Sequence, residues 1–519
     1  MSSASEPSEL GDLSPEELRR RGYSAIDWIV ELLASSRDLP VLARTRPGDL
    51  LAALPLQGPE EPQDWEQTLA DLNDLILPGI THWNHPRFFA YFANTGSVPG
   101  IIGATLATAL NPNSMLWRTS PAATELEQRV LEWLAGWLGL PTSLFGIIND
   151  TASVSTLCAL AAARQLVPGY SSQEGMGSLA APLRLYASEQ AHSSIDKAAL
   201  LLGLGTASVR KIPTRADYSM DPHALEAAIV SDLAAGEIPF CVVATAGTTS
   251  TTSIDPLEKI ATLCARFDLW LHVDAAYGGA AAVVPDMRPR FRGWERADSI
   301  VVNPHKWLFT PMCCSVLYTR RPDDLRAAFS LVPEYLRSDV GDDRSEAQGD
   351  DADGLGAAPI DFMNYGIQLG RPFRALKLWM VMNAYGRAGI EQRLRHHMEL
   401  AARFASWVDE HPDFERLAPT PLSTVCFRYR PGAGRGTGDG TDLAPVPQDP
   451  HAAANEELMA RVNRGGQIFL SHTRLRGRLA LRLAIGNLRT TAADVQHAWQ
   501  TLLDTRPPVA TRGTGGVAS

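Results

Sequence analysis

Residues 301–310 read VVNPHKWLFT, an apolar and β-branched run that ends by placing a lysine between a histidine and a tryptophan. The run is typical of a short buried strand, and Asn303, His305 and Lys306 follow where that strand ends. Taken alone, a lysine in this position is most simply a surface residue, because lysine is seldom buried. A functional interpretation needs support from the rest of the chain.

Helical and strand-like patterns alternate on both sides of this stretch, from about residue 100 to residue 320. The helical patterns cover 120–139, 152–165, 221–235 and 255–267, and the short apolar runs cover 240–246, 269–276 and 299–304. Such alternation predicts βαβ units and a mostly parallel sheet with helices on both faces. After about residue 390 the order changes, which indicates a smaller α+β domain.

The pattern divides the chain into four predicted parts. In the first part, Ser14 is placed to cap a helix that begins at Pro15, and Glu17 completes a capping box. Two Gly/Asp/Pro-rich stretches, 339–359 and 431–450, are expected to be mobile. The parts are an N-terminal helical segment (1–95), a large domain (96–388) with a mobile loop at about 330–359, a small α+β domain (389–503) and a disordered tail (504–519).

Composition narrows the class of function. The chain has 519 residues, 45% of them hydrophobic, and so can bury a large core. Its net charge of −11 argues against nucleic acid or an anionic membrane as a partner, since both require a cationic surface. The six cysteines show no metal-ligand spacing, and the sequence has neither a leader-like start nor an apolar run long enough to span a membrane. We therefore expect a cytoplasmic protein without a metal site.

Three polar clusters follow predicted strands. Asp274 ends the run LWLHVDAA, Lys306 follows the run at 299–304, and Thr151 stands where a helix begins. Separately, Thr151 and Asp274 are most simply caps or turn residues. Because the carboxyl ends of parallel strands form the ligand-binding edge of an α/β sheet, we expect the three to meet.

Together the clusters describe a site for pyridoxal phosphate. A helix N-terminus can hold the phosphate, a carboxylate can hold the pyridinium N–H, and a lysine can form the Schiff base. Ala276 leaves room for a flat ring. Partial burial would lower the pKa of Lys306, which is the direction that imine formation requires.

Five segments then carry a family resemblance. THWNHPRFFAYF, SPAATELE, EQAHSSIDKAAL, HVDAAYGG and NPHKW occur in this order. They resemble the pyridoxal-phosphate-dependent amino-acid decarboxylases, most closely the aromatic-L-amino-acid decarboxylases, and the similarity runs over nearly the whole chain. It implies an α/β fold like that of aspartate aminotransferase, with a mostly parallel sheet of seven strands. It also implies a homodimer with active sites at the subunit interface and with residues 1–95 packed on the partner.

The resemblance assigns roles to single residues. Lys306 would carry the Schiff base, Asp274 would pair with the ring nitrogen, and His192 and Ala276 would lie on opposite faces of the ring. Thr249 would lie near the phenolic oxygen of the ring. The residues expected to bind the cofactor are Ala152, Ser153, His192, Thr249, Asp274, Ala276, Asn303, His305 and Lys306.

The substrate pocket is assigned in the same way. Trp83, Tyr91 and Phe92 are candidates to line the site of an aromatic side chain, although packing in a core is the commoner use of such a cluster. The chain departs from the animal enzymes at Ala93 and Asn94, where they have Pro and Thr. Further candidates for substrate contacts are Asn94, Asn113, Met115 and Gly370. Asn113 and Met115 stand where the animal enzymes have apolar or aromatic residues that touch the substrate ring across the dimer, and Gly370 matches a plant branch that acts on indole substrates.

Tyr335 completes the predicted catalytic set of Lys306, Asp274, His192 and Tyr335. A tyrosine hydroxyl is a competent general acid for protonating the α-carbon after carbon dioxide has left. In the family, Tyr at this position accompanies simple decarboxylation, and Phe accompanies release of an aldehyde. We therefore expect decarboxylation of an aromatic L-amino acid. The alternatives are another L-amino acid, an aldehyde synthase, transamination, or a non-catalytic protein on the same scaffold.

Overall fold

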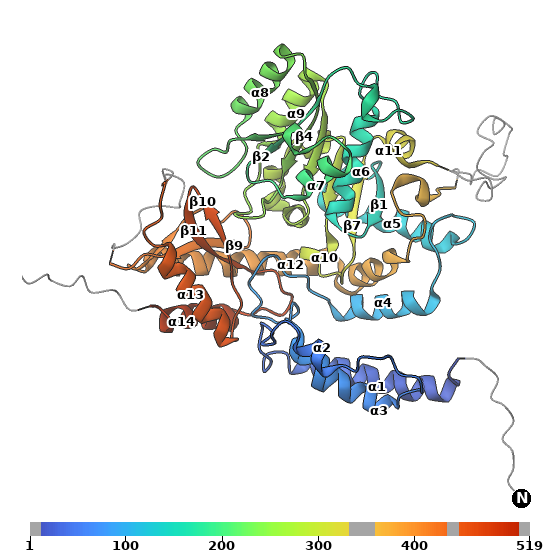
Figure 1. The fold of residues 1–519 in the computed structure, drawn as a ribbon, viewed down its shortest axis with the longest axis vertical. Coiled ribbons are helices and arrows are strands. Elements are labelled where there is room, and N and C mark those ends of the chain that lie inside the picture. The colour runs from blue at the N-terminus through green and yellow to red at the C-terminus, as the bar shows by residue number, and fades with distance from the viewer. Residues whose placement is uncertain (1–11, 332–358, 433–445, 508–519) are drawn as a thin grey trace, which may run out of the picture.

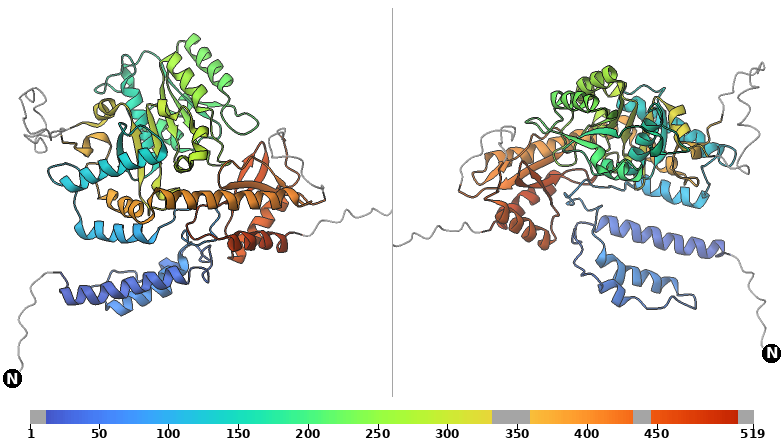
Figure 2. Two further views of the ribbon diagram at one scale, coloured as in Figure 1. Left: turned by 180° about the vertical axis from the view of Figure 1, so that it is seen from behind. Right: turned by 45° about the horizontal axis from the view of Figure 1, so that its top comes forward.

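The computed structural model describes residues 12–331, 359–432 and 446–507 (Figure 1). Tyr335 and residues 332–358 of the predicted loop lie outside them. The described residues form a large sheet-based domain, a smaller domain beside it, and a group of N-terminal helices that stands apart from both (Figures 1 and 2). None of the helices in the described part of the chain is long and apolar enough to cross a membrane.

The large domain is built on a seven-stranded mixed sheet, which confirms the predicted fold class. Its order is β1-β7-β6-β5-β4-β2-β3, and only β7 runs antiparallel to its neighbours. The carboxyl ends of the other strands therefore share one edge. The strands are β1 (Phe145–Asn149), β2 (Leu183–Ser188), β3 (Val209–Ile212), β4 (Ile238–Thr245), β5 (Trp270–Asp274), β6 (Ser299–Val302) and β7 (Ser315–Thr319).

Helices cover both faces of this sheet, as the alternating pattern predicts. Side chains along a strand point to opposite faces, so both sets of side chains must be apolar, and the strands read as continuous apolar runs. One face packs on α6 (Ala152–Gln165), α7 (Ser194–Leu201) and α11 (Pro322–Phe329). The other packs on α5 (Pro121–Leu138), α8 (Pro222–Ala234), α9 (Leu257–Phe267) and the first part of α12 (Arg374–Glu410).

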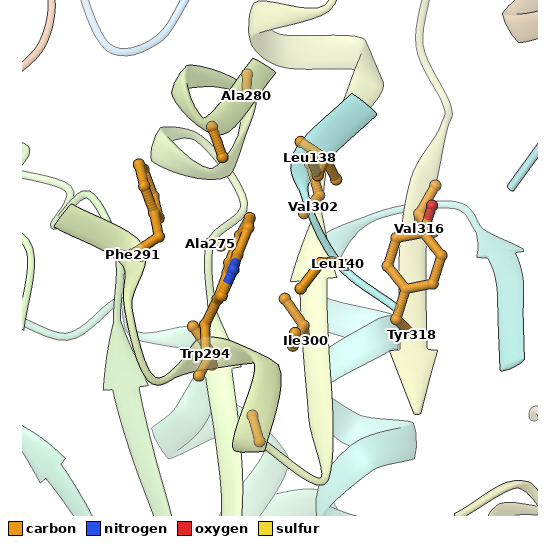
Figure 3. Packing of buried hydrophobic residues seen from close by; sticks show 14 of the residues in the cluster. Leu138, Leu140, Ala275, Ala280, Phe291, Trp294, Ile300, Val302, Val316 and Tyr318 are labelled. Carbon is orange, nitrogen blue, oxygen red and sulfur yellow. The ribbon is translucent and has the colours of Figure 1, made fainter. Parts of the chain in front are cut away.

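The larger of the two resulting cores lies directly behind the ligand-binding edge. Ala275 and Ala280, which follow β5, pack with Ile300 and Val302 of β6 and with Leu138 at the end of α5 (Figure 3). All of these side chains are buried. The core therefore fixes the chain that leads away from Asp274 and the strand that leads toward Lys306.

The small domain pairs a four-stranded antiparallel sheet, ordered β10-β11-β9-β8, with three helices. Its helices are the end of α12, α13 (Ala452–Gly465) and α14 (Ala492–Asp504), and its strands are β8 (Phe414–Arg416), β9 (Thr424–Tyr429), β10 (Ser471–Leu475) and β11 (Arg478–Ala484). The predicted boundary at residue 389 falls inside α12, just after Gly386, whose φ of 59° and ψ of 172° kink the helix. Pro507, placed in the predicted tail, accepts a hydrogen bond from the hydroxyl of Tyr429.

The N-terminal helices are α1 (Pro15–Ala34), α2 (Asp49–Ala53) and α3 (Trp65–Asp71). As predicted, the side chain of Ser14 caps α1 by accepting the N–H of Glu17 at 3.1 Å. Glu17 does not complete the predicted capping box, because its carboxylate instead accepts hydrogen bonds from Arg20 and Arg21. α1 buries none of its residues, and Tyr23 and Val30 are 67% and 59% exposed. α4 (Val98–Leu110) likewise exposes apolar side chains, among them Leu110 at 66%.

A buried ion pair joins distant parts of the large domain. Glu127 of α5 and Arg371 are 1% and 4% exposed, and a carboxylate oxygen of Glu127 lies 2.6 Å from Nη2 of Arg371. The same oxygen accepts the N–H of Ile148 in β1, and the guanidinium donates to the carbonyls of Ile148 and Ser114. The pair thus fixes the start of α12 against the sheet.

Replacing Glu127 with Ala should destabilise the protein by about 3–5 kcal/mol, because it leaves the buried guanidinium without its counter-charge. The matched control is Glu132→Ala on the same helix. Its carboxylate pairs with Arg129 at the surface, and such pairs contribute about 0.2–1 kcal/mol. Urea unfolding followed by tryptophan fluorescence measures both losses. Equal losses for the two variants would contradict this account of the buried pair.

Candidate active site

A cavity of about 320 Å³ lies at the carboxyl edge of the large sheet. Residues of the large domain, the small domain and the N-terminal segment contribute to its wall. The lining residues are Trp83, Tyr91, Phe92, Asn94, Thr151, Ala152, Ser153, His192, Thr245, Gly247, Thr249, Asp274, Ala276, Tyr277, Asn303, His305, Lys306, Met312 and Arg482. Every residue that the sequence predicts to bind the cofactor is in this set.

Asp274 is the last residue of β5. Side chains alternate between the two faces of the sheet along a strand, and this alternation decides which face Asp274 points to. Trp270 packs in the core under α6, so His272 and Asp274 point to that same face. The carboxylate is 6% exposed, and its Oδ1 accepts the N–H of Ala276 at 3.1 Å. In the parallel register Asp274 lies opposite Val301 of β6. The polar residues that follow β6 therefore emerge beside it.

Lys306 lies in α10 (Pro304–Trp307), a single helical turn directly after β6. Its Nζ is 5.6 Å from the ring centre of Phe92, across the cavity wall. Burial lowers the pKa of the Lys306 amine below its ordinary value, and the carboxylate of Asp274 opposes this by attracting the charged form. A lysine with a lowered pKa more readily supplies the neutral amine that attacks an aldehyde.

His305 and Asn303 form a buried polar wall beside Lys306. Nδ1 of His305 accepts the N–H of Cys314 at 2.9 Å, and burial, reinforced by the charge of Lys306, lowers the pKa of the ring to about 3. The ring is therefore neutral at physiological pH. Oδ1 of Asn303 and Oγ1 of Thr245 are buried without a hydrogen-bond partner among the described residues. A polar group bound in the cavity would satisfy atoms that are otherwise costly to bury.

The N-terminus of α6 opens into the same cavity. Thr151 is its N-cap residue, yet the Thr151 side chain makes no capping hydrogen bond. The simple interpretation of Thr151 as a side-chain cap is therefore wrong. The backbone N–H groups of the first helical turn and the nearby hydroxyls are suited to a phosphate. The donors, the carboxylate of Asp274 and the amine of Lys306 together fit pyridoxal phosphate.

His192 lies at the exposed side of the cavity. Its Nδ1 accepts the N–H of Ser194 at 3.1 Å, so the neutral ring carries its hydrogen on Nε2. Desolvation lowers the pKa of His192, and Asp274 acts in the opposite direction. Ala276 and Thr249 line the cavity as well, Ala276 with 6% of its surface exposed. The neutral ring of His192 is thus available to pack on a flat ligand.

The N-terminal segment supplies an aromatic wall. Phe89 donates its N–H to the carbonyl of Phe469 at 3.0 Å, which ties the segment to the small domain. Next to it, the rings of Trp83 and Tyr91 stack with centres 5.7 Å apart. The side-chain amide of Asn94 lies 3.4 Å from Sδ of Met312. An aromatic or apolar substrate side chain would fit this wall better than a charged one.

Three predicted substrate contacts do not line the cavity within the described chain: Asn113, Met115 and Gly370. They form a cluster of their own. Nδ2 of Asn113 lies 3.3 Å from Sδ of Met115, and Oδ1 of Asn113 accepts the N–H of Arg371 at 3.0 Å. Among the described residues, this cluster and the lining of the cavity are separate.

Sequence reasoning missed Thr245, Gly247, Tyr277, Met312 and Arg482. Arg482 of β11 is 4% exposed and donates to the carbonyls of Thr249 and Ser250 at 2.7 and 2.9 Å, so it ties the loop after β4 to the small domain. The sequence did contain one signal for Arg482. An arginine inside the apolar run LALRLAIG is expected to be buried, and a buried arginine needs hydrogen-bond or ion-pair partners. The position of its partners in the fold could not be read from the run. The described residues contain no cluster of three or more metal-ligating side chains.

Comparison with known proteins matches residues 47–430 to the pyridoxal-dependent decarboxylase conserved domain. Tyrosine decarboxylase 3 of Petroselinum crispum is 36% identical over 95% of this chain and 93% of its own. Phenylacetaldehyde synthase of a Rosa hybrid cultivar is 35% identical over 95% and 94%. The crystal structure of Oryza sativa TDC with PLP and tryptamine is 36% identical, covers 96% of this chain and 99% of its own, and superposes with a TM-score of 0.87.

Proposed function

Because the chain belongs to the pyridoxal-dependent decarboxylase family, we propose that it removes the α-carboxyl group of an aromatic L-amino acid and releases the amine. The chain is a carboxy-lyase and uses pyridoxal phosphate. The observation that carries the proposal is the meeting of Lys306, Asp274 and the N-terminus of α6 in one cavity. A non-catalytic binding protein would have no use for this combination.

Different residues of the cavity would bind different parts of the cofactor. Lys306 would hold the aldehyde carbon of pyridoxal phosphate through its nitrogen, and Asp274 would keep a proton on the ring nitrogen. When bound, pyridoxal phosphate supplies an electron-poor ring that takes up the electron pair left as the carboxyl group departs. His192 and Ala276 would hold the two faces of the ring, and Thr249 would lie near its phenolic oxygen. Ala152, Ser153, Asn303 and His305 would hold the phosphate.

The proton that completes the reaction comes from Tyr335. This assignment rests on the sequence, since Tyr335 lies outside the described residues. A tyrosine hydroxyl can donate a proton to the α-carbon when it is held close to it. The relative from Rosa is named as an aldehyde synthase, so an aldehyde-forming reaction is the second candidate. The presence of tyrosine rather than phenylalanine favours the amine.

An aromatic substrate is favoured by the wall of the cavity. Trp83, Tyr91 and Phe92 present rings, and Asn94 lies on the same wall with its amide turned to Met312. Stacked or edge-to-face contacts with an aromatic side chain stabilise binding beyond the apolar area that they bury. A substrate carboxylate on the side chain, as in glutamate, would be desolvated against these rings at a cost, because the guanidinium of Arg482 already donates to the carbonyls of Thr249 and Ser250.

A homodimer accounts for features that one chain leaves incomplete. α1 and α4 expose apolar side chains, and a second copy would cover them. In that arrangement Asn113, Met115 and Gly370 of one subunit would reach the cavity of its partner. We place the enzyme in the cytoplasm, where its six unpaired cysteines fit a reducing environment.

Lys306→Ala should abolish turnover and remove the visible absorbance of the protein-bound imine, because no other residue is proposed to supply its nitrogen. Lys306→Arg should do the same, since a guanidinium stays protonated. Absorbance spectra before and after borohydride treatment, together with amine release, test this. A variant that kept both the imine absorbance and normal turnover would refute the role of Lys306.

The substrate class is tested by measuring carbon dioxide and amine from Trp, Tyr, Phe, dopa, His and Glu. Turnover is expected for at least one aromatic amino acid and to be at least about a hundredfold lower for Glu, which corresponds to roughly 2.7 kcal/mol. The physical reason is the apolar aromatic wall. Preferred turnover of Glu or His would contradict the assignment.

Tyr335→Phe should retain substrate binding, lose most amine formation and gain aldehyde with consumption of oxygen. Without the hydroxyl the α-carbon is not protonated and is left to react with dioxygen. Chromatography of the products and an oxygen electrode measure the change, with wild type and Tyr365→Phe as controls, since Tyr365 is a buried tyrosine that does not line the cavity. Wild-type amine formation without oxygen uptake in Tyr335→Phe would make that tyrosine structural.

The dimer is tested by sedimentation equilibrium. The expected mass is twice the 56.3 kDa of the chain. Replacing Leu106 and Leu110 on α4 with Asp should shift the population toward monomer and lower activity, because charges would then face the interface. A monomeric, fully active wild-type enzyme would exclude shared active sites.

A further inference from the structure

Three buried aromatic rings stack in a column that starts at the cavity wall, and a fourth ring lies edge to edge with the last of them. Phe92 lines the cavity, and its ring centre lies 3.8 Å from that of Tyr277 with an angle of 14° between the planes. Tyr277 stacks on Trp307 at 4.8 Å and 6°, and Trp307 lies parallel to His397 at 6.4 Å and 7°. His397, at the far end, does not line the cavity. We call Phe92, Tyr277, Trp307 and His397 the aromatic column.

The column contacts Lys306 in two ways. Trp307 is the next residue in the chain, so the orientation of its side chain constrains the backbone that carries the lysine. Phe92 presents its ring to the Lys306 amine at 5.6 Å. α10, which carries both Lys306 and Trp307, is only four residues long. Such a short helix has little internal hydrogen bonding, so its side-chain contacts must set its position.

His397 holds the column through a directional bond. Its Nδ1 accepts the indole N–H of Trp307 at 2.9 Å. Burial lowers the pKa of His397 to about 3, so the ring is neutral and carries one hydrogen. With Nδ1 accepting, that hydrogen is on Nε2, and the ring is also hydrogen-bonded to the backbone of Asn487. Both ring nitrogens are therefore used, and neither is free for chemistry of its own.

Asn487, which bonds to the other side of the His397 ring, belongs to a segment that contacts the residues flanking the cavity wall. The side chain of Asn487 donates to the carbonyl of His85 at 3.0 Å, and the carbonyl of Gly486 accepts the hydroxyl of Thr95 at 3.2 Å. His85 and Thr95 flank the segment that carries Tyr91, Phe92 and Asn94. His397 thus joins the turn that holds the lysine to the loop that holds the substrate wall.

We propose that His397 is a positioning residue, which fixes Lys306 for imine formation by holding Trp307. The proposal rests on the assigned role of Lys306. An apolar side chain at 397 could fill the space but would leave the indole N–H buried without an acceptor. The short helix could then turn, and small displacements of a reacting group are costly in rate.

The test is the rate at which the full-length protein, freed of cofactor, forms the imine with added pyridoxal phosphate, followed by absorbance and normalised to the folded fraction. His397→Leu should slow this step by at least about tenfold. His397→Gln, which keeps an acceptor and a donor, should stay within about threefold of wild type. His396→Leu, a change at the exposed neighbouring histidine, should have no effect.

Trp307→Phe keeps the test decisive if His397→Leu fails to fold. It removes the donor and leaves His397 in place, so it should slow imine formation to a similar extent. In the Trp307→Phe background, His397→Leu should add less than about twofold, because the bond is already lost. Wild-type rates in folded His397→Leu or in Trp307→Phe, or fully additive effects, would overturn the proposal. Absence of any imine in the wild type would instead refute the role of Lys306.

Discussion

At the carboxyl edge of the sheet, burial and a neighbouring carboxylate act in opposite directions on the charge of the Lys306 amine, and the rest of the structure serves to hold these two groups together. A lysine amine and a carboxylate are both withdrawn from water, and burial favours the neutral amine while Asp274 favours the charged one. The parallel pairing of β5 with β6 brings them together, because Asp274 lies opposite Val301 and Lys306 follows one turn later. The two cores hold this edge in place, so the chemistry depends on packing far from the cavity.

The local sequence was sufficient to predict the location of a site residue wherever that residue directly follows a strand. Asp274, Ala276, Asn303 and Lys306 all follow apolar runs, and parallel strands bring their carboxyl ends to one edge whatever the details of the fold. The alternation of helices and strands likewise predicted the sheet and its two covered faces. The role of His192 required the family resemblance, since one histidine in a polar stretch carries no signal of its own.

Residues supplied by distant segments could not be predicted in the same way. Arg482 acts from the small domain on the carbonyls of Thr249 and Ser250, and that contact depends on how the two domains pack. The bond from Trp307 to His397 spans two elements far apart in the chain. Asn113 was expected to reach the substrate across the dimer, and within one chain it lies in a separate cluster. Its predicted role therefore depends on a second subunit.

Burial lowers the pKa of Lys306 while Asp274 raises it. The pH dependence of imine formation with pyridoxal phosphate measures this directly when it is normalised to the reaction of a free lysine derivative. We expect a midpoint for the wild type below the ordinary lysine value of about 10.4. We expect a still lower midpoint for Asp274→Asn, because the attraction that favours the charged amine is removed. An ordinary midpoint in the wild type, or a higher midpoint in Asp274→Asn, would contradict it.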